Sequence, residues 1–280
     1  AHIYQGKTPR ADSVSHPGLS TLPTTQKVFV TLISILLAAR LATIGLELLW
    51  RPLFPWDATM HWATKARVWF DAGNIVPFVE NKEWLKVGGK DVFTDHHPDY
   101  PITIPLLQVW MNSATGYWNA SLMNLPWLLC LIALGFAFYG QARASGVGLM
   151  IAITFGYFLL SMPLINTHVA LAGYADLFLG ACYCAALMAF HNWTVERQLW
   201  QAGMALFFAL SCTLIKNEGF YWLLTFVPAL AVVLLPRCKA VILLVLILLT
   251  LICLLVFIPA DLIIAGHSLK QLNLHYRPEA

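Results

Sequence analysis

Long apolar segments recur through most of this 280-residue chain, and they limit its fold more than any other feature. A helix needs about 20 mainly apolar residues to cross the hydrocarbon layer of a bilayer. Hydrophobic residues make up 59% of the chain and charged residues only 11%, with a mean hydropathy of +0.69. We therefore predict an all-α fold, a polytopic transmembrane helical bundle with about seven to eight spans. The apolar segments are residues 28–50, 122–140, 147–165, 175–192, 199–215, 220–235 and 240–258.

A further apolar segment, residues 101–118, is short and carries the polar side chains of Gln108, Asn112, Ser113 and Thr115. We expect it to enter the membrane without crossing it. The predicted organisation is a flexible N-terminal tail at residues 1–27, a transmembrane bundle at 28–260 that includes an extracytoplasmic loop at 51–104, and a C-terminal tail at 261–280.

Basic residues are placed unevenly among the short connections between apolar segments. Connections rich in Lys and Arg face the cytoplasm in most membrane proteins. The other polar clusters, at residues 166–174 and 216–219, should then face the opposite side together with the polar segment 55–105. A complete crossing by residues 101–118 would instead move the later loops to the other side. The basic connections are residues 141–146, 194–198 and 236–239.

The segment 55–105 is the longest polar stretch between the first and last apolar segments. Residues 57–71 contain neither Pro nor Gly, which predicts a helix with Asp57, His61 and Lys65 at positions i, i+4 and i+8 on one side. Tryptophans near a membrane boundary usually lie at headgroup level. We therefore expect this helix to lie along the bilayer surface.

Asp57 has two interpretations. An aspartate at a helix start commonly caps the first free backbone amides. A carboxylate at the outer end of the first apolar segment is also suited to act as a general base, which deprotonates a hydroxyl or amine. The two roles are compatible.

His61 and Lys65 also allow two interpretations. They would form a solvated helix face, with Lys65 paired to Asp57 or Asp71, or they would bind a ligand. An ammonium group binds phosphate as a point charge, and we expect Lys65 and Lys216 to open into one groove. His61, one turn after Asp57, could also contribute to a metal site.

The sequence DHHPDYP contains His96, His97 and Asp99, and its two prolines bracket Asp99 and Tyr100 and favour an extended turn. These residue types bind metals, so Asp57, His61 and His96 are weak metal candidates. Adjacent histidines do not easily bind one ion together. The favoured interpretation is that His97 and Asp99 line the mouth of a cavity and hydrogen-bond a ligand.

Two further polar groups interrupt the apolar pattern. Asp176 begins a predicted span and is expected to cap it. Lys216 and Glu218 lie in the sequence KNEG between two apolar segments, as a charged helix-helix turn or as part of a ligand site. Polar residues at membrane depth are costly and often mark a ligand or a pathway.

Several of these features together resemble the bacterial integral-membrane glycosyltransferases of the GT-C superfamily, of the aminoarabinose and protein O-mannosyl transferase type. They are an Asp after the first span, the segment WDATMHWATKARVWF, the sequence HPDYPITIP, the Asp of YADLFLG and the KNEG turn. The resemblance implies sugar transfer from a polyprenyl-phosphate carrier to an acceptor on the extracytoplasmic face of the bacterial inner (plasma) membrane. Asp57 matches the catalytic acid. The residues expected to bind substrate are Lys65, His61, His97, Asp99, Asp176, Lys216 and Glu218. No cofactor is expected to be required, and the site is compatible with a divalent metal.

The chain also departs from this family. Ala58 stands where many members carry a second acid, and members usually have more spans. The alternative hypothesis is a non-catalytic membrane subunit of a larger membrane protein complex, in contact with membrane lipids and other membrane proteins. A net charge of +3 spread among loops predicts no nucleic-acid partner, because such partners require clustered basic residues.

Overall fold

A computed structural model describes residue 20 and residues 22–257, 263–264 and 267–268. Most of the predicted tails at 1–27 and 261–280 therefore lie outside the described residues. The described chain is all-α apart from two pairs of two-residue strands. It divides into two compact units, residues 1–223 and 224–280.

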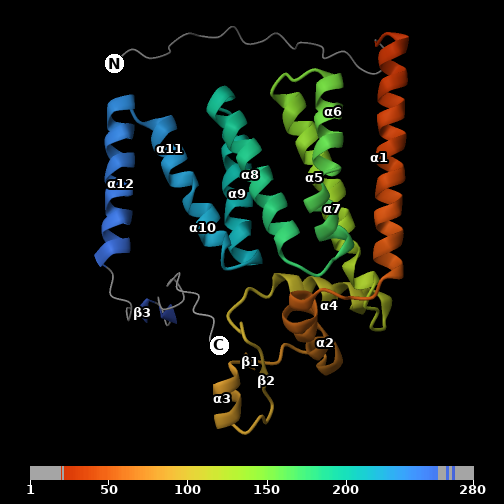
Figure 1. Ribbon diagram of the computed structural model, residues 1–280, viewed down its shortest axis with the longest axis vertical. Helices are drawn as coiled ribbons and strands as arrows, with labels where there is room; N and C mark the ends of the chain where they lie inside the picture. The colour runs from red at the N-terminus through yellow and green to blue at the C-terminus, as the bar shows by residue number, and fades with distance from the viewer. Residues whose placement is uncertain (1–19, 21, 258–262, 265–266, 269–280) are drawn as a thin grey trace, which may run out of the picture. The chain divides into compact units, whose positions relative to one another are not determined.

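The first unit is built around a helical bundle (Figure 1). Helix α8 packs against α9 and α5, α5 packs against α6, and α1 packs against α5, α6 and α7. The core contains Trp127, Leu131, Val169 and Cys212, none of which is exposed. The bundle helices are α1 (Thr24–Trp50), α5 (Leu125–Ala144), α6 (Leu149–Leu160), α7 (Pro163–Ala170), α8 (Asp176–Glu196) and α9 (Leu199–Ile215).

Two helices within the described residues are long and apolar enough to cross a membrane, Thr24–Trp50 and Leu122–Ala144. A third candidate exists if α6 and α7, bent by 53° at their junction, count as one span. The predicted number of seven to eight spans is therefore wrong for these residues. Pro163 starts a new helix within one predicted apolar segment, and α9 has only 17 residues. The positions of the helices along the chain agree with the predicted apolar segments. Fewer of these helices than predicted are long and apolar enough to cross a membrane.

The polar segment forms a separate layer at one end of the bundle (Figure 1). Helix α4 packs against α2 and against the short turn η3, and it buries Gln108 and Asn112. Residues 101–118 thus lie with α2 and do not run among the long helices. The elements of this layer are the π-helix η2 (Ala58–Trp62), α2 (Ala63–Ala72), α3 (Asn81–Lys86), α4 (Thr103–Thr115), the 3-10 turn η3 (Leu122–Asn124), and the parallel strands β1 (Phe78–Val79) and β2 (Phe93–Thr94).

The division of the chain into two units, after Leu223, falls within helix α10 (Gly219–Leu224). In the second unit, α11 (Phe226–Leu234) packs against α12 (Arg237–Phe257). The strands β3 (Ile263–Ile264) and β4 (His267–Ser268) pair antiparallel.

Candidate functional site

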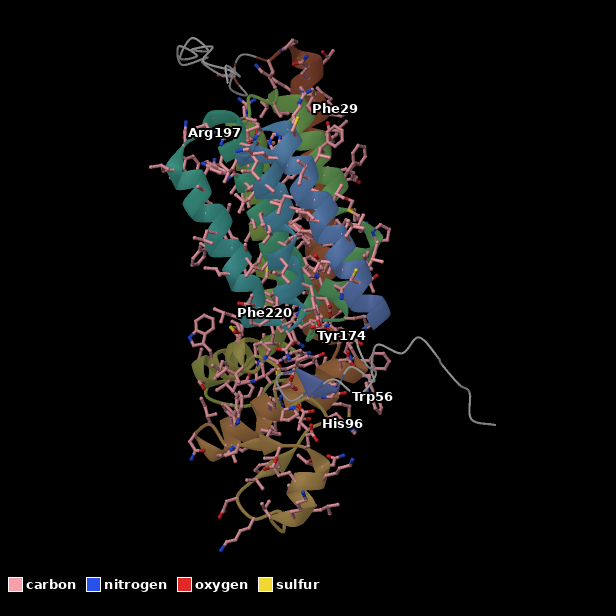
Figure 2. The ribbon with its side chains drawn as sticks, turned by 90° about the vertical axis from the view of Figure 1, so that its left-hand side faces the viewer. Phe29, Trp56, His96, Tyr174, Arg197 and Phe220 are labelled. Carbon is pink, nitrogen blue, oxygen red and sulfur yellow. The ribbon has the colours of Figure 1, made fainter. Side chains whose placement is uncertain are left out.

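The residues with candidate chemistry are found at the end of the bundle that carries the polar layer. Figure 2 shows Trp56, His96 and Tyr174 at this end, whereas Phe29 and Arg197 lie at the other. Three separate parts of the chain meet here: the helix that begins after Pro55, the loop that joins β2 to α4, and the ends of α8 and α9.

A π-helix begins the first of these parts. Asp57 precedes it, is exposed, and makes no side-chain capping hydrogen bond. The capping role considered for Asp57 is therefore absent. Single-turn π-helices are rare and frequently occur at functional sites. This one also packs tightly, because a Cβ atom added at Gly173 would lie 2.5 Å from Ala58 Cβ.

Further along the same helix, Lys65 is buried and forms an ion pair with Asp95. The Lys65 Nζ atom lies 2.7 Å from Asp95 Oδ2, and the two side chains are only 3% and 2% exposed. The same ammonium group donates a hydrogen bond of 2.8 Å to the His97 carbonyl oxygen. The expected pairing of Lys65 with Asp57 or Asp71 is wrong, since Asp71 pairs with Arg67.

Asp95 also binds the imidazole of His61. His61 Nδ1 lies 2.5 Å from Asp95 Oδ1, and the His97 backbone amide donates to the same oxygen at 3.3 Å. Burial alone would raise the pKa of Asp95, but hydrogen bonds from Lys65 and His61 and the charge of Lys65 outweigh it and lower the pKa. Asp95 is therefore ionised at neutral pH.

Stacked rings connect this ionic cluster to the bundle. The His97 ring lies 5.2 Å from that of His61 and 4.9 Å from that of Tyr100. Tyr100 also stacks on the buried Trp62, with the ring planes 10° apart. The rings thus fix the DHHPDYP loop against the π-helix.

The Tyr100 hydroxyl extends toward the KNEG turn, where it donates to Glu218 Oε1 at 3.5 Å. The other oxygen, Glu218 Oε2, is buried and has no hydrogen-bond partner within the described part of the chain. Burial and the charge of Glu218 raise the pKa of Tyr100, so its hydroxyl keeps its proton. A second link joins the same segments, because Asn217 Nδ2 donates to Asp99 Oδ2 at 2.7 Å.

Lys216 completes the network at the start of α8. Its Nζ atom lies 3.0 Å from Asp176 Oδ1 and 3.6 Å from Glu218 Oε1. Burial alone would lower the pKa of Lys216, but the hydrogen bond and charge of Asp176 outweigh it and raise the pKa. Asp176 is the first residue of α8 and not its cap, so the predicted capping role is wrong.

Sequence reasoning placed some of these residues well and missed others. The contacts above join three distant parts of the sequence. These parts contribute Asp99, Asp176, and the pair Lys216 and Glu218. Lys65 is too buried to open into a groove with Lys216, so that expectation is wrong. The central acid of the cluster was missed, although it begins the DHHPDYP sequence.

The described residues contain no group of three His, Cys, Asp or Glu side chains that could hold a metal ion. Of the three weak candidates, His61 is hydrogen-bonded to Asp95, while Asp57 and His96 are exposed. The arrangement is instead a set of paired charges. Within the described residues, three atoms or groups of the site have no hydrogen-bond partner: the Asp57 carboxylate, His61 Nε2 and Glu218 Oε2. Comparisons with protein-family models, curated proteins and solved structures found no match to this chain.

Proposed function

We propose that this protein is an integral-membrane glycosyltransferase that transfers a sugar from a polyprenyl-phosphate carrier to an acceptor on the extracytoplasmic face of the bacterial inner membrane. The observation that carries the proposal is the joined polar network at one end of an apolar bundle. It connects the π-helix, the DHHPDYP loop and the KNEG turn through His61, Asp95, Tyr100, Glu218 and Lys216.

This network has the chemical groups that such a reaction needs. Lys216 supplies a cation for the carrier phosphate, which would otherwise be excluded from an apolar groove by its desolvation cost. The unpartnered Glu218 Oε2 offers an acceptor for a sugar hydroxyl. Asp57 is an exposed carboxylate that directly follows Trp56, which Figure 2 shows at the same end, and in this proposal it contacts the attacking hydroxyl or amine of the acceptor.

Lys65 has a different role in this proposal from the one expected from the sequence. Its side chain is only 3% exposed, against 18% for Lys216, and its ammonium group is bound to Asp95 and to the His97 carbonyl oxygen. It therefore holds the DHHPDYP loop in place and does not bind the phosphate. His97 and Asp99 are both exposed, and in this proposal they contact the ligand at the edge of the site.

Two long apolar helices and the distribution of basic residues support the membrane setting. Arg143 lies in the last turn of α5 and Arg197 directly follows α8, at the ends of these helices that are opposite the polar layer (Figure 1). Arginine-bearing connections usually face the cytoplasm, and this supports an extracytoplasmic polar layer.

A transfer assay tests the proposal. The full chain in detergent micelles is incubated with undecaprenyl-phosphate carrying radiolabelled mannose, glucose or 4-amino-4-deoxyarabinose, and with lipid and peptide acceptors. We expect one carrier to be consumed, and Asp57→Asn to slow consumption about a hundredfold, because the acceptor loses the carboxylate that orients it. Because Asp57 makes no capping bond, this variant should fold like the parent. No transfer or hydrolysis by the parent, together with copurification of a membrane partner, would favour the non-catalytic subunit.

A further inference from the structure

The imidazole of His61 is held from one side and open on the other. Its Nδ1 atom binds Asp95 at 2.5 Å, and Asp95 is ionised, so Nδ1 carries the proton and donates it to the carboxylate. Within the described residues, no hydrogen bond to His61 Nε2 is found, and this atom is not among the buried unpartnered ones. The side chain as a whole is only 12% exposed. A largely buried ring thus presents a single basic nitrogen outward.

A role as a simple structural contact does not require this arrangement. Lys65 already neutralises Asp95 and anchors the His97 carbonyl oxygen, so the loop is fixed without a histidine. An imidazole in a fixed tautomer is, however, the usual form of a general base: a carboxylate orients it and stabilises the imidazolium that forms. Imidazole is also the side chain that titrates closest to neutral pH.

We propose that His61 is the residue that accepts the proton released by the acceptor, with Asp95 as its positioning residue. This inference rests on the proposed function. As the acceptor oxygen or nitrogen forms its bond to the sugar C1 atom, its bond to hydrogen breaks and the proton moves to His61 Nε2. The C1–oxygen bond to the carrier breaks at the same time, and its electron pair leaves with the polyprenyl phosphate. The imidazolium later returns the proton to water. Asp57, one turn earlier, orients the acceptor by accepting its hydrogen bond.

The groups that face His61 hold its ring in this orientation. Asp95 binds Nδ1, Lys65 pairs with the same carboxylate, and the His97 ring lies 5.2 Å from the imidazole.

The first test uses His61→Gln. Glutamine can still donate an amide hydrogen to Asp95 but cannot accept a proton from the acceptor. We expect kcat for transfer to fall about a hundred- to ten-thousand-fold with KM for the carrier unchanged. The matched control is His191→Gln, an exposed histidine on α8 at the other end of the bundle, which should keep the parent kcat and KM. A parent-like kcat in His61→Gln would overturn the inference.

The second test needs no enzymatic activity. Diethyl pyrocarbonate acylates the free nitrogen of a neutral imidazole, and peptide mapping by mass spectrometry identifies each modified histidine. We expect His61 to be modified in the folded parent, because its Nε2 atom has no hydrogen-bond partner within the described residues. Failure of His61 to react while the exposed His96 reacts would refute the inference and leave the proposed function standing. Absence of any transfer by the parent would instead refute the proposed function and the catalytic role of His61 with it.

Discussion

Replacement of Asp95 by Asn should destabilise the protein strongly, because it leaves a buried ammonium group without its counter-charge. The Lys65 and Asp95 side chains are 3% and 2% exposed, and their charged atoms are 2.7 Å apart. Removal of one partner from a buried ion pair costs about 3–5 kcal/mol. At about 1.4 kcal/mol per tenfold change, the folded-to-unfolded ratio should fall by two to four powers of ten.

Two further variants separate this effect from a general loss of charge. Asp71→Asn removes the carboxylate of the exposed pair with Arg67, whose side chains are 48% and 52% exposed, and should cost less than about 0.5 kcal/mol. Lys65→Met combined with Asp95→Asn removes both buried charges and should regain most of the loss. Unfolding in detergent micelles measures each cost, and hydrogen exchange over residues 93–100 detects local opening of the loop. A cost for Asp95→Asn no larger than that for Asp71→Asn would refute the reasoning.

The same pair predicts an acid limit to stability. The pKa of Asp95 in the folded protein is below the ordinary aspartate value of 3.8. Its contribution to stability is therefore complete above that pH and is lost as pH falls through the lower, folded value. Stability should therefore decline below about pH 4 in the parent. This part of the decline should be absent in Asp95→Asn.

Three further predictions follow from single contacts. Gly173→Ala should lower the free energy of unfolding by about 1–3 kcal/mol, because its φ is +105° and the new Cβ would lie 2.5 Å from a side-chain atom of η2. Gly203→Ala, in open space on α9, should raise the free energy of unfolding by about 0.5–1 kcal/mol in the same assay. Lys216→Met should weaken binding of the polyprenyl-phosphate carrier about ten- to a hundredfold in a binding titration, since a charged hydrogen bond is lost. In intact cells, an impermeant thiol reagent should label Lys86→Cys but not Arg197→Cys, and labelling of both would contradict the proposed orientation.

The sequence predicts the helices well because apolar segments and helix-breaking residues are local signals. The start of α1, the αL end of α2 at Gly73 and the short α4 agree with the expected elements to within a few residues. The number of spans was overestimated because composition does not show where an apolar segment bends. The break before Pro163 divides one predicted span into two helices at 53°.

The site was only partly predictable, because its central contacts join residues far apart in the chain. Asp95 lies 34 residues after His61, in a polar loop where burial of a charge has no local sequence signal. Regular helical spacing predicted that Asp57, His61 and Lys65 share one face. In the structure the π-helix lies between the first and last of these, and their environments differ from exposed to fully buried.

The central claim is that a polyprenyl-phosphate sugar binds at the polar end of the bundle, and photocrosslinking tests it most directly. A carrier analogue with a diazirine beside its phosphate is activated on the purified full chain, and labelled peptides are mapped by mass spectrometry. The account predicts labelling of residues 96–101 and 216–218, with unlabelled carrier competing. Labelling confined to residues 141–147 and 194–198, at the opposite end of the bundle, would contradict it.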